Sequence, residues 1–155
     1  MTITRNGDVI ENIIFANIDI LNHHEPQENY WDALAINAGD RNKVCNVLYD
    51  NIRVERIEQG QFIDVRVVYN KDYNLEPGTS IRGITFCDIS YSGKANPSRI
   101  YGFDEERTVE VVTFINLRVN DELINAPRSE LMDINAFAKN IIFVIEEIAS
   151  EQSNL

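Results

Sequence analysis

Short runs in which apolar and polar residues alternate recur along most of this chain. Each run reads apolar-x-aromatic, then two residues, then apolar-x-apolar. The alternation has a period of two on both sides of a two-residue corner, so each run predicts two short strands joined by a tight bend. Four clear copies and a fifth, weaker copy occupy residues 9–20, 44–54, 81–91, 109–119 and 139–143.

The copies follow one another at similar intervals. Equivalent apolar positions are Ile13, Val47, Ile84, Val112 and Ile141, which lie 34, 37, 28 and 29 residues apart. A unit that recurs at such intervals is typical of proteins built from stacked repeats.

The second corner residue of each clear copy is Asn17, Asn51, Asp88 or Asn116. Asn and Asp tolerate the left-handed backbone conformation and hydrogen-bond across turns. If the copies stack, these side chains form a ladder.

A third strand-like run lies between successive copies, at residues 32–37, 62–67 and 98–101. Three short strands per repeat predict an all-β parallel β-helix of about five coils. The expected division is a lead-in at 1–8, the β-helix domain at 9–144 and a C-terminal cap or disordered tail at 145–155. The alternative is a β-sandwich whose strands resemble one another by chance.

Composition agrees with stacked strands. The 155 residues include 21 Ile and 12 Val against 8 Leu and 9 Ala, and 18 Asn. β-Branched residues favour strands. The net charge of −11 disfavours nucleic acid and anionic membranes as partners.

We find no apolar run of membrane-spanning length and no signal peptide at the start of the sequence. The expected location is therefore cytoplasmic, or extracellular if the chain is a fragment of a longer secreted protein. Cys45 and Cys87 lack metal-site spacing, so we expect neither a metal nor a cofactor.

Alternation within the third strands indicates which side chains leave the core. We expect an outward row of Ala33, Ala35, Asn37, Asp64, Arg66, Arg99 and Tyr101 on successive coils. The loop at 22–32 adds His23, His24, Glu25, Tyr30 and Trp31 beside this face.

Such a face suits a sugar polymer, because aromatic rings stack on pyranose rings while charged and amide groups bind hydroxyls. The candidate substrate-binding residues are His23, His24, Tyr30, Trp31, Arg66, Arg99 and Tyr101. Glycoside hydrolysis needs two carboxyl groups, about 5 to 5.5 Å apart for retention or about 6.5 to 9.5 Å for inversion. The candidate catalytic residues are Glu25, Asp32 and Asp64.

Simpler interpretations remain open for these residues. Asp64 and Arg66 are also what a solvated strand face with ion pairs to Arg99 would contain. The histidine segment also suits a plain polar loop, and Trp31 could plug the core below it.

The repeated units, together with residues 77–86 and 96–105, resemble the C-terminal coils of a right-handed, single-stranded β-helix of the pectin lyase-like superfamily. The nearest resemblance is to bacterial proteins related to polygalacturonases of glycoside hydrolase family 28, and it spans about residues 9–143. It implies a carbohydrate-active parent architecture. The family's Asn-Thr-Asp, Asp-Asp and Gly-His-Gly strings are absent, so no catalytic residue is carried over.

Three functions follow as hypotheses. The first is a β-helix domain that binds a polysaccharide or oligosaccharide and lacks the standard catalytic centre. The second is a glycosidase that acts on pectic or neutral polysaccharide through an unusual carboxylate pair. The third is a structural fragment that self-associates through the exposed end of its β-helix, because unpaired strand edges invite pairing with another chain.

Overall fold

The computed structural model describes residues 7–27 and 32–146, which form strands and contain no helix. Within this part of the chain no helix could therefore cross a membrane. The protein is all-β, its sheets are mainly parallel, and their strands stack in chain order. Most of the expected tail at 145–155, and residues 1–6 of the expected lead-in, lie outside the described residues.

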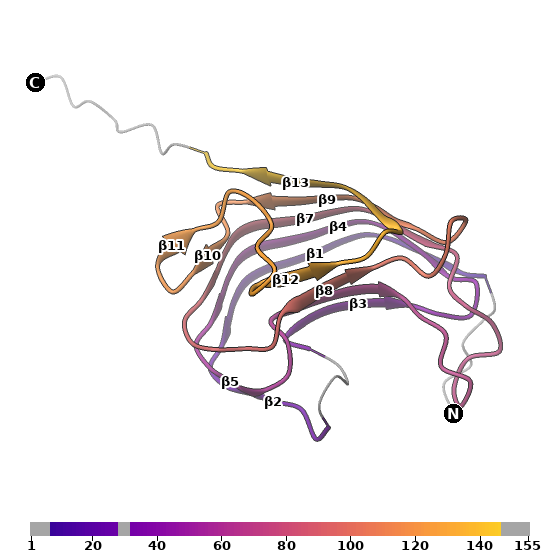
Figure 1. Cartoon of the computed structure of the whole chain (residues 1–155), viewed down its shortest axis with the longest axis horizontal. Coiled ribbons are helices and arrows are strands. Elements are labelled where there is room, and N and C mark those ends of the chain that lie inside the picture. Colours follow the sequence, from indigo (N-terminus) through magenta and orange to yellow (C-terminus); the bar gives the residue numbers. More distant parts are fainter. Residues whose placement is uncertain (1–6, 28–31, 147–155) are drawn as a thin grey trace, which may run out of the picture.

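The first sheet is the largest, and Figure 1 shows its long strands one above another from β13 to β1. It contains the parallel strands β1 (Val9–Ile20), β4 (Lys43–Val54), β7 (Ser80–Tyr91), β9 (Val109–Ile115) and β13 (Ala138–Val144). Beyond β9, β10 (Arg118–Val119) also pairs with β7, and β11 (Glu122–Leu123) pairs antiparallel with β10.

The second sheet receives one strand from each turn of the chain. It consists of β3 (Leu34–Ala38), β6 (Ile63–Val67), β8 (Ser98–Tyr101) and β12 (Met132–Ile134), all parallel. The three runs predicted as third strands are therefore confirmed as β3, β6 and β8. A small third sheet pairs β2 (His23–His24) with β5 (Ile57–Gln59).

The core lies between the sheets and is built from rows of identical or similar side chains. Ile13, Val47, Ile84, Val112 and Ile141 form one continuous row, as the repeat predicts. A second row stacks aromatic rings with centroids 4.9 to 5.2 Å apart. Its members are Phe15, Tyr49, Phe86, Phe114 and Phe143. Parallel strands in register bring equivalent residues together, so each turn buries the same side chains as the one before.

The predicted corner is confirmed, because all four of its residues adopt a left-handed backbone with φ between 52° and 58°. The Asn51 side chain donates to Asn17 over 2.7 Å, and Asn116 donates to Asp88 over 2.9 Å. The alternation did not predict a second left-handed position five residues earlier in each run. That position is occupied by Asn12, Asn46, Gly83, Val111 and Asn140.

Candidate functional site

The outer face of the second sheet carries the polar residues that the sequence singles out. Pleat alternation turns Leu34, Ile63 and Ile100 into the core, where they are buried. Their neighbours form two outer rows across the sheet: Ala35, Asp64, Arg99 and Asp133, then Asn37, Arg66 and Tyr101. The predicted facing is confirmed for the residues within β3, β6 and β8. It is wrong for Ala33, which precedes β3 and packs against the core.

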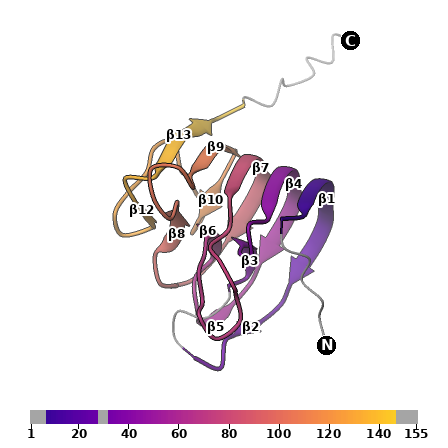
Figure 2. The same cartoon turned by 90° about the vertical axis from the view of Figure 1, so that its right-hand side faces the viewer.

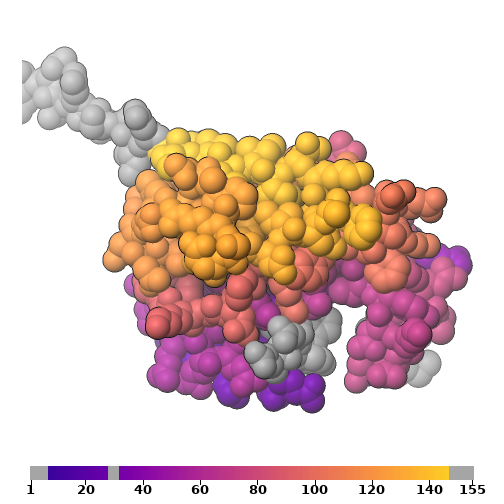
Figure 3. All heavy atoms as spheres, viewed as in Figure 1, coloured from indigo at the N-terminus to yellow at the C-terminus, as the bar shows by residue number. Residues whose placement is uncertain are grey.

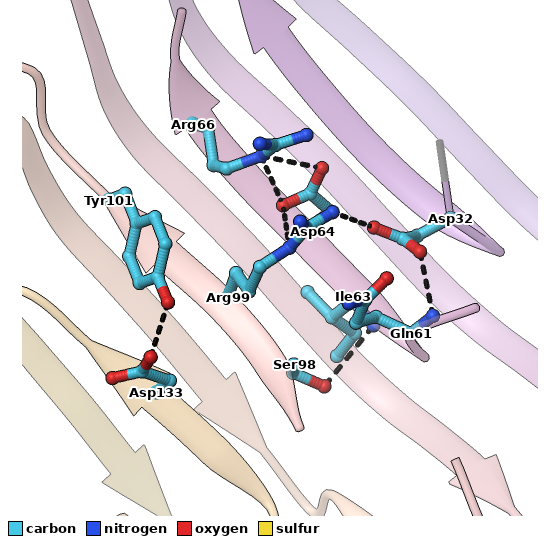
Figure 4. Close-up of polar contacts among 9 residues, drawn as sticks. All are labelled: Asp32, Gln61, Ile63, Asp64, Arg66, Ser98, Arg99, Tyr101 and Asp133. Atoms are coloured by element: carbon cyan, nitrogen blue, oxygen red, sulfur yellow. Dashed lines mark hydrogen bonds and ion pairs between the residues drawn. The ribbon is translucent and has the colours of Figure 1, made fainter. Parts of the chain in front are cut away.

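Four charged side chains meet on this face (Figure 4). Arg99 Nη2 lies 2.7 Å from Asp32 Oδ2, and Arg99 Nε lies 3.1 Å from Asp64 Oδ1. Arg66 Nε approaches the same Asp64 oxygen at 2.6 Å. Asp32 also accepts a hydrogen bond from the backbone N–H of Gln61 over 2.6 Å. We call Asp32, Asp64, Arg66 and Arg99 the ion cluster.

The ion cluster is largely covered, which the sequence did not indicate. Asp64 is 0% exposed, Asp32 7% and Arg99 8%. The expectation of a solvated row is therefore wrong for Asp64 and Arg99. Alternation tells only that a side chain leaves the core, whereas other parts of the fold determine whether water reaches it.

Burial and the neighbouring charges have opposite effects on the pKa of Asp64. Burial raises its pKa to about 6, although the neighbouring Arg66 and Arg99 guanidinium groups lower it and Asp32 raises it slightly. A carboxylate held by two guanidinium groups has its oxygens committed to strong charge-assisted contacts. The cluster thus joins β6, β8 and the segment that precedes β3 by electrostatics.

Glu25 and His23 lie near the cluster on the side of the third sheet. His23 Nε2 is 3.2 Å from Glu25 Oε1, and Glu25 is buried. A Cβ placed on Gly60 would lie 3.2 to 3.3 Å from Glu25, Asp32 and His23. The structure therefore brings these three predicted residues together around a glycine that leaves them room.

The remaining predicted residues of the loop fall into two groups. His24 is exposed and lies 3.5 Å from Glu58, away from the ion cluster. Tyr30 and Trp31 lie outside the described residues. The substrate-binding role predicted for these three residues remains a prediction.

A hollow of about 980 Å³ opens at the end of the same face, where β3, β6 and β8 finish. Figure 3 shows it beside the magenta loop that follows β6. Asn37, Arg66 and Tyr101 of the second outer row line it, with Tyr69, Tyr73 and Phe103 from the loops at 68–78 and 102–107. We call it the aromatic hollow.

The loop wall of the aromatic hollow is held by buried Asp40. Asp40 accepts hydrogen bonds from the Asn74 side chain over 3.0 Å and from the Leu75 N–H over 2.7 Å. Tyr69 and Phe103 meet edge to face with centroids 6.4 Å apart. Aromatic rings are thus presented from an ordered wall while 38% of Tyr69, 75% of Tyr73 and 40% of Phe103 remain exposed.

Two polar groups on the floor of the hollow differ in their bonding. Tyr101 donates its hydroxyl hydrogen to Asp133, and burial, helped by this carboxylate, raises the Tyr101 pKa to about 12. Both amide atoms of Asn37 are buried, and neither has a hydrogen-bond partner among the described residues. Buried amides normally have partners, so the Asn37 amide is an unsatisfied polar group beside the hollow, although its two amide atoms have no surface open to a ligand.

Sequence reasoning missed the three aromatic side chains of the hollow. Tyr69, Tyr73 and Phe103 lie in segments with no alternation, so their position depends on loop paths rather than strand register. Clustering of aromatic residues shortly after two of the predicted third strands was the available signal.

One group of potential metal ligands occurs on the first sheet within the described residues. Single ligand atoms of Asp50, Cys87 and Asp88 lie within 4.8 Å of one another. Burial, aided by the two carboxylates, raises the Cys87 pKa to about 11. A protonated thiol is a poor ligand, and exposed acidic groups commonly gather without a metal.

Comparison of the chain with protein-family models, curated protein sequences and solved structures finds no match in any of the three. The functional argument therefore rests on the residues and their arrangement.

Proposed function

We propose that this protein is a right-handed, single-stranded parallel β-helix domain of about five coils that binds a neutral oligosaccharide in the aromatic hollow. Support for the architecture comes from the stacking of β1, β4, β7, β9 and β13 in one sheet and β3, β6, β8 and β12 in another. Each turn of chain supplies a strand to both sheets until β13. The repeated units of the sequence resemble pectin lyase-like proteins, and this resemblance implies a carbohydrate-active architecture.

The observation that carries the proposed binding is the set of partly exposed rings, Tyr69, Tyr73 and Phe103, that line one hollow. Aromatic faces contact the apolar faces of pyranose rings, and an exposed amide of the same hollow, such as Asn70, can bond to sugar hydroxyls. The hollow is also within the usual size range of small-molecule sites, about 300 to 1,000 Å³.

Charge favours a neutral sugar over a polyuronate. A substrate carboxylate needs an available cation. Of the two cations that line the hollow, Arg66 already contacts Asp64, and Lys71 shares the hollow with the carboxylate of Asp40. The ion cluster contains two positive and two negative side chains, so it has no net charge when both carboxyls are ionised. The overall charge of −11 further repels an anionic polymer.

We infer that the protein binds without hydrolysing its ligand. Asp64 has no exposed surface and Asp32 is held by Arg99 and the Gln61 amide, which speaks against either reaching a glycosidic oxygen. The alternative is a glycosidase that uses Glu25, Asp32 and Asp64. Its supporting observations are the proximity of Glu25 and Asp32 at Gly60 and the raised pKa of Asp64.

Calorimetric titration with neutral and pectic oligosaccharides tests the binding proposal. Tyr73→Ala and Phe103→Ala should each weaken neutral-sugar binding by about fivefold to tenfold, since each removes one stacking ring. Phe15→Ala is the matched control: Phe15 is also 40% exposed but lies on β1, outside the hollow. If no neutral oligosaccharide binds, or if Phe15→Ala weakens binding equally, the proposal is wrong.

Incubation with the same sugars separates binding from hydrolysis. We expect no new reducing ends by chromatography after prolonged incubation. Sugar cleavage that disappears in Glu25→Gln or Asp32→Asn, with the fold retained by circular dichroism, would instead support the glycosidase.

A further inference from the structure

The two ends of the first sheet leave apolar side chains more exposed than the equivalent side chains of the strands between them. Within the described residues, β1 pairs only with β4, and β13 pairs only with β9. Figure 2 shows these two strands at opposite ends of the stack. Phe15 on β1 is 40% exposed, whereas Tyr49, the next ring in its row, is 5% exposed. At the β1 end, the aromatic row of the core is therefore exposed to solvent.

Apolar exposure at both ends is extensive. On β1 the exposed apolar residues are Val9, Ile10, Ile14, Phe15 and Ile18, and at the other end they are Ile142, Val144 and Ile145. Each end also presents a strand edge whose outer backbone groups have no partner strand among the described residues. Such edges readily accept another β-strand.

The ends complement each other because both belong to the same set of rows. In the strand register, Ile14 lies in one row with Leu48, Thr85, Thr113 and Ile142. The aromatic row likewise runs from Phe15 on β1 to Phe143 on β13. A second copy placed so that its β1 follows β13 would extend both rows without changing the register.

Charge is complementary in the same register. The row that begins with Glu11 on β1 passes through Cys45, Arg82 and Glu110 and ends with Lys139 on β13. Glu11 and Lys139 are both exposed. In the extended stack, Lys139 of one copy would face Glu11 of the next.

We propose that copies of this chain associate head to tail, with β13 of one copy pairing in parallel with β1 of the next. Ile142 then meets Ile14, Phe143 stacks on Phe15, and Lys139 pairs with Glu11. The two surfaces of this contact differ, so each added copy presents a new free end. Such heterologous contacts generate rods of increasing length unless the stack closes on itself. Sugar binding plays no part in the association.

Sedimentation velocity of the full chain over a range of concentrations tests the proposal. The average mass should rise continuously with concentration, beyond that of a dimer. Ile14→Glu and Ile142→Glu should each weaken association by at least about tenfold, because each places a charge in the apolar contact. Thr85→Glu is the matched control, since it lies in the same row inside the stack and should leave association unchanged.

A charge exchange tests the direction of stacking. Glu11→Lys alone and Lys139→Glu alone should each weaken association several-fold, because like charges then meet at every contact. An equimolar mixture of the two variants should restore association, since every mixed contact again pairs opposite charges.

A protein that stays monomeric at all concentrations would overturn the proposal. So would association that stops at a dimer and is insensitive to Ile142→Glu, which would indicate pairing between two β1 edges. Failure of the mixture to recover would exclude the proposed register.

Discussion

Arg99 Nη2 lies 2.7 Å from Asp32 Oδ2, although 67 residues separate the two in the sequence. Arg99 belongs to β8 and Asp32 precedes β3, with β6 and its Asp64 between them in the sheet. The guanidinium group therefore joins three successive turns of the chain.

Replacement of Arg99 should strongly destabilise the protein. Arg99→Met leaves the buried Asp32 and Asp64 carboxylates without their shared cation, which costs about 3 to 5 kcal/mol in comparable buried pairs. Urea unfolding measures this loss. Arg53→Met is the matched control: Arg53 pairs with Asp19 at 3.1 Å on the exposed surface, so its loss should change the free energy of unfolding little. Equal effects of the two substitutions would contradict a structural role for the ion cluster.

The stability should depend on pH through Asp64. Its pKa is about 6 in the folded protein and about 3.9 in an unfolded chain, so the folded state binds this proton more tightly. The resulting stabilisation is complete below about pH 4 and is lost as pH rises through about 6. We expect this contribution, on the order of 3 kcal/mol, to disappear in Asp64→Asn.

Urea unfolding at a series of pH values between 4 and 8 isolates this contribution. The relevant quantity is the difference in slope between wild type and Asp64→Asn, because the substitution also changes the stability at every pH. Parallel curves would show that Asp64 has the same pKa in the folded and unfolded states.

Asn51 should contribute to stability more through its tolerance of a left-handed backbone than through its side-chain hydrogen bond. Its φ is 52°, a region that costs an ordinary L-residue about 1 to 2 kcal/mol, and its side chain donates to Asn17 over 2.7 Å. Asn51→Gly loses only the hydrogen bond, whereas Asn51→Ala also incurs the backbone cost. Chemical unfolding should therefore rank Ala below Gly by about 1 kcal/mol. The reverse order would contradict this explanation of the corner.

Replacement of Val111 should stabilise the protein, because Val111 is a β-branched residue in a left-handed conformation. Its φ is 57°, and equivalent positions in the other turns hold Asn or Gly. Val111→Asn should raise the free energy of unfolding by about 1 kcal/mol, measured in urea. Thr113→Gly on the same strand is the control. Thr113 has no left-handed φ, so glycine at this position should destabilise the protein. A loss of stability in Val111→Asn would show that packing outweighs backbone strain there.

Much of the architecture could be predicted because it depends on local alternation. The rows that contain Ile13 and Phe15, and the corner at Asn17, recur in the sequence with the spacing that the structure uses. Short elements were not predicted, because alternation cannot be recognised over two or three residues. β12 has three residues, Met132–Ile134, too few to show a period of two. The left-handed position at Asn12 lies within the alternating run and interrupts it too briefly to be recognised.

The candidate site could be predicted only in part. Asp64, Arg66 and Arg99 were assigned to one face from the pleat, and their adjacency across β6 and β8 follows from the register. The aromatic hollow was not predicted, since Tyr69 and Phe103 meet through two irregular loops.

The sequence by itself determined which side chains enter the core, because the β-pleat turns alternate residues to opposite faces. It also determined the corner residues, because few residue types tolerate a left-handed backbone. Tertiary structure decided that Asp64 and Arg99 are covered, that Phe15 is not, and that rings from separate loops line one hollow. Exposure depends on how distant segments of the folded chain cover one another, and a local pattern carries no information about that.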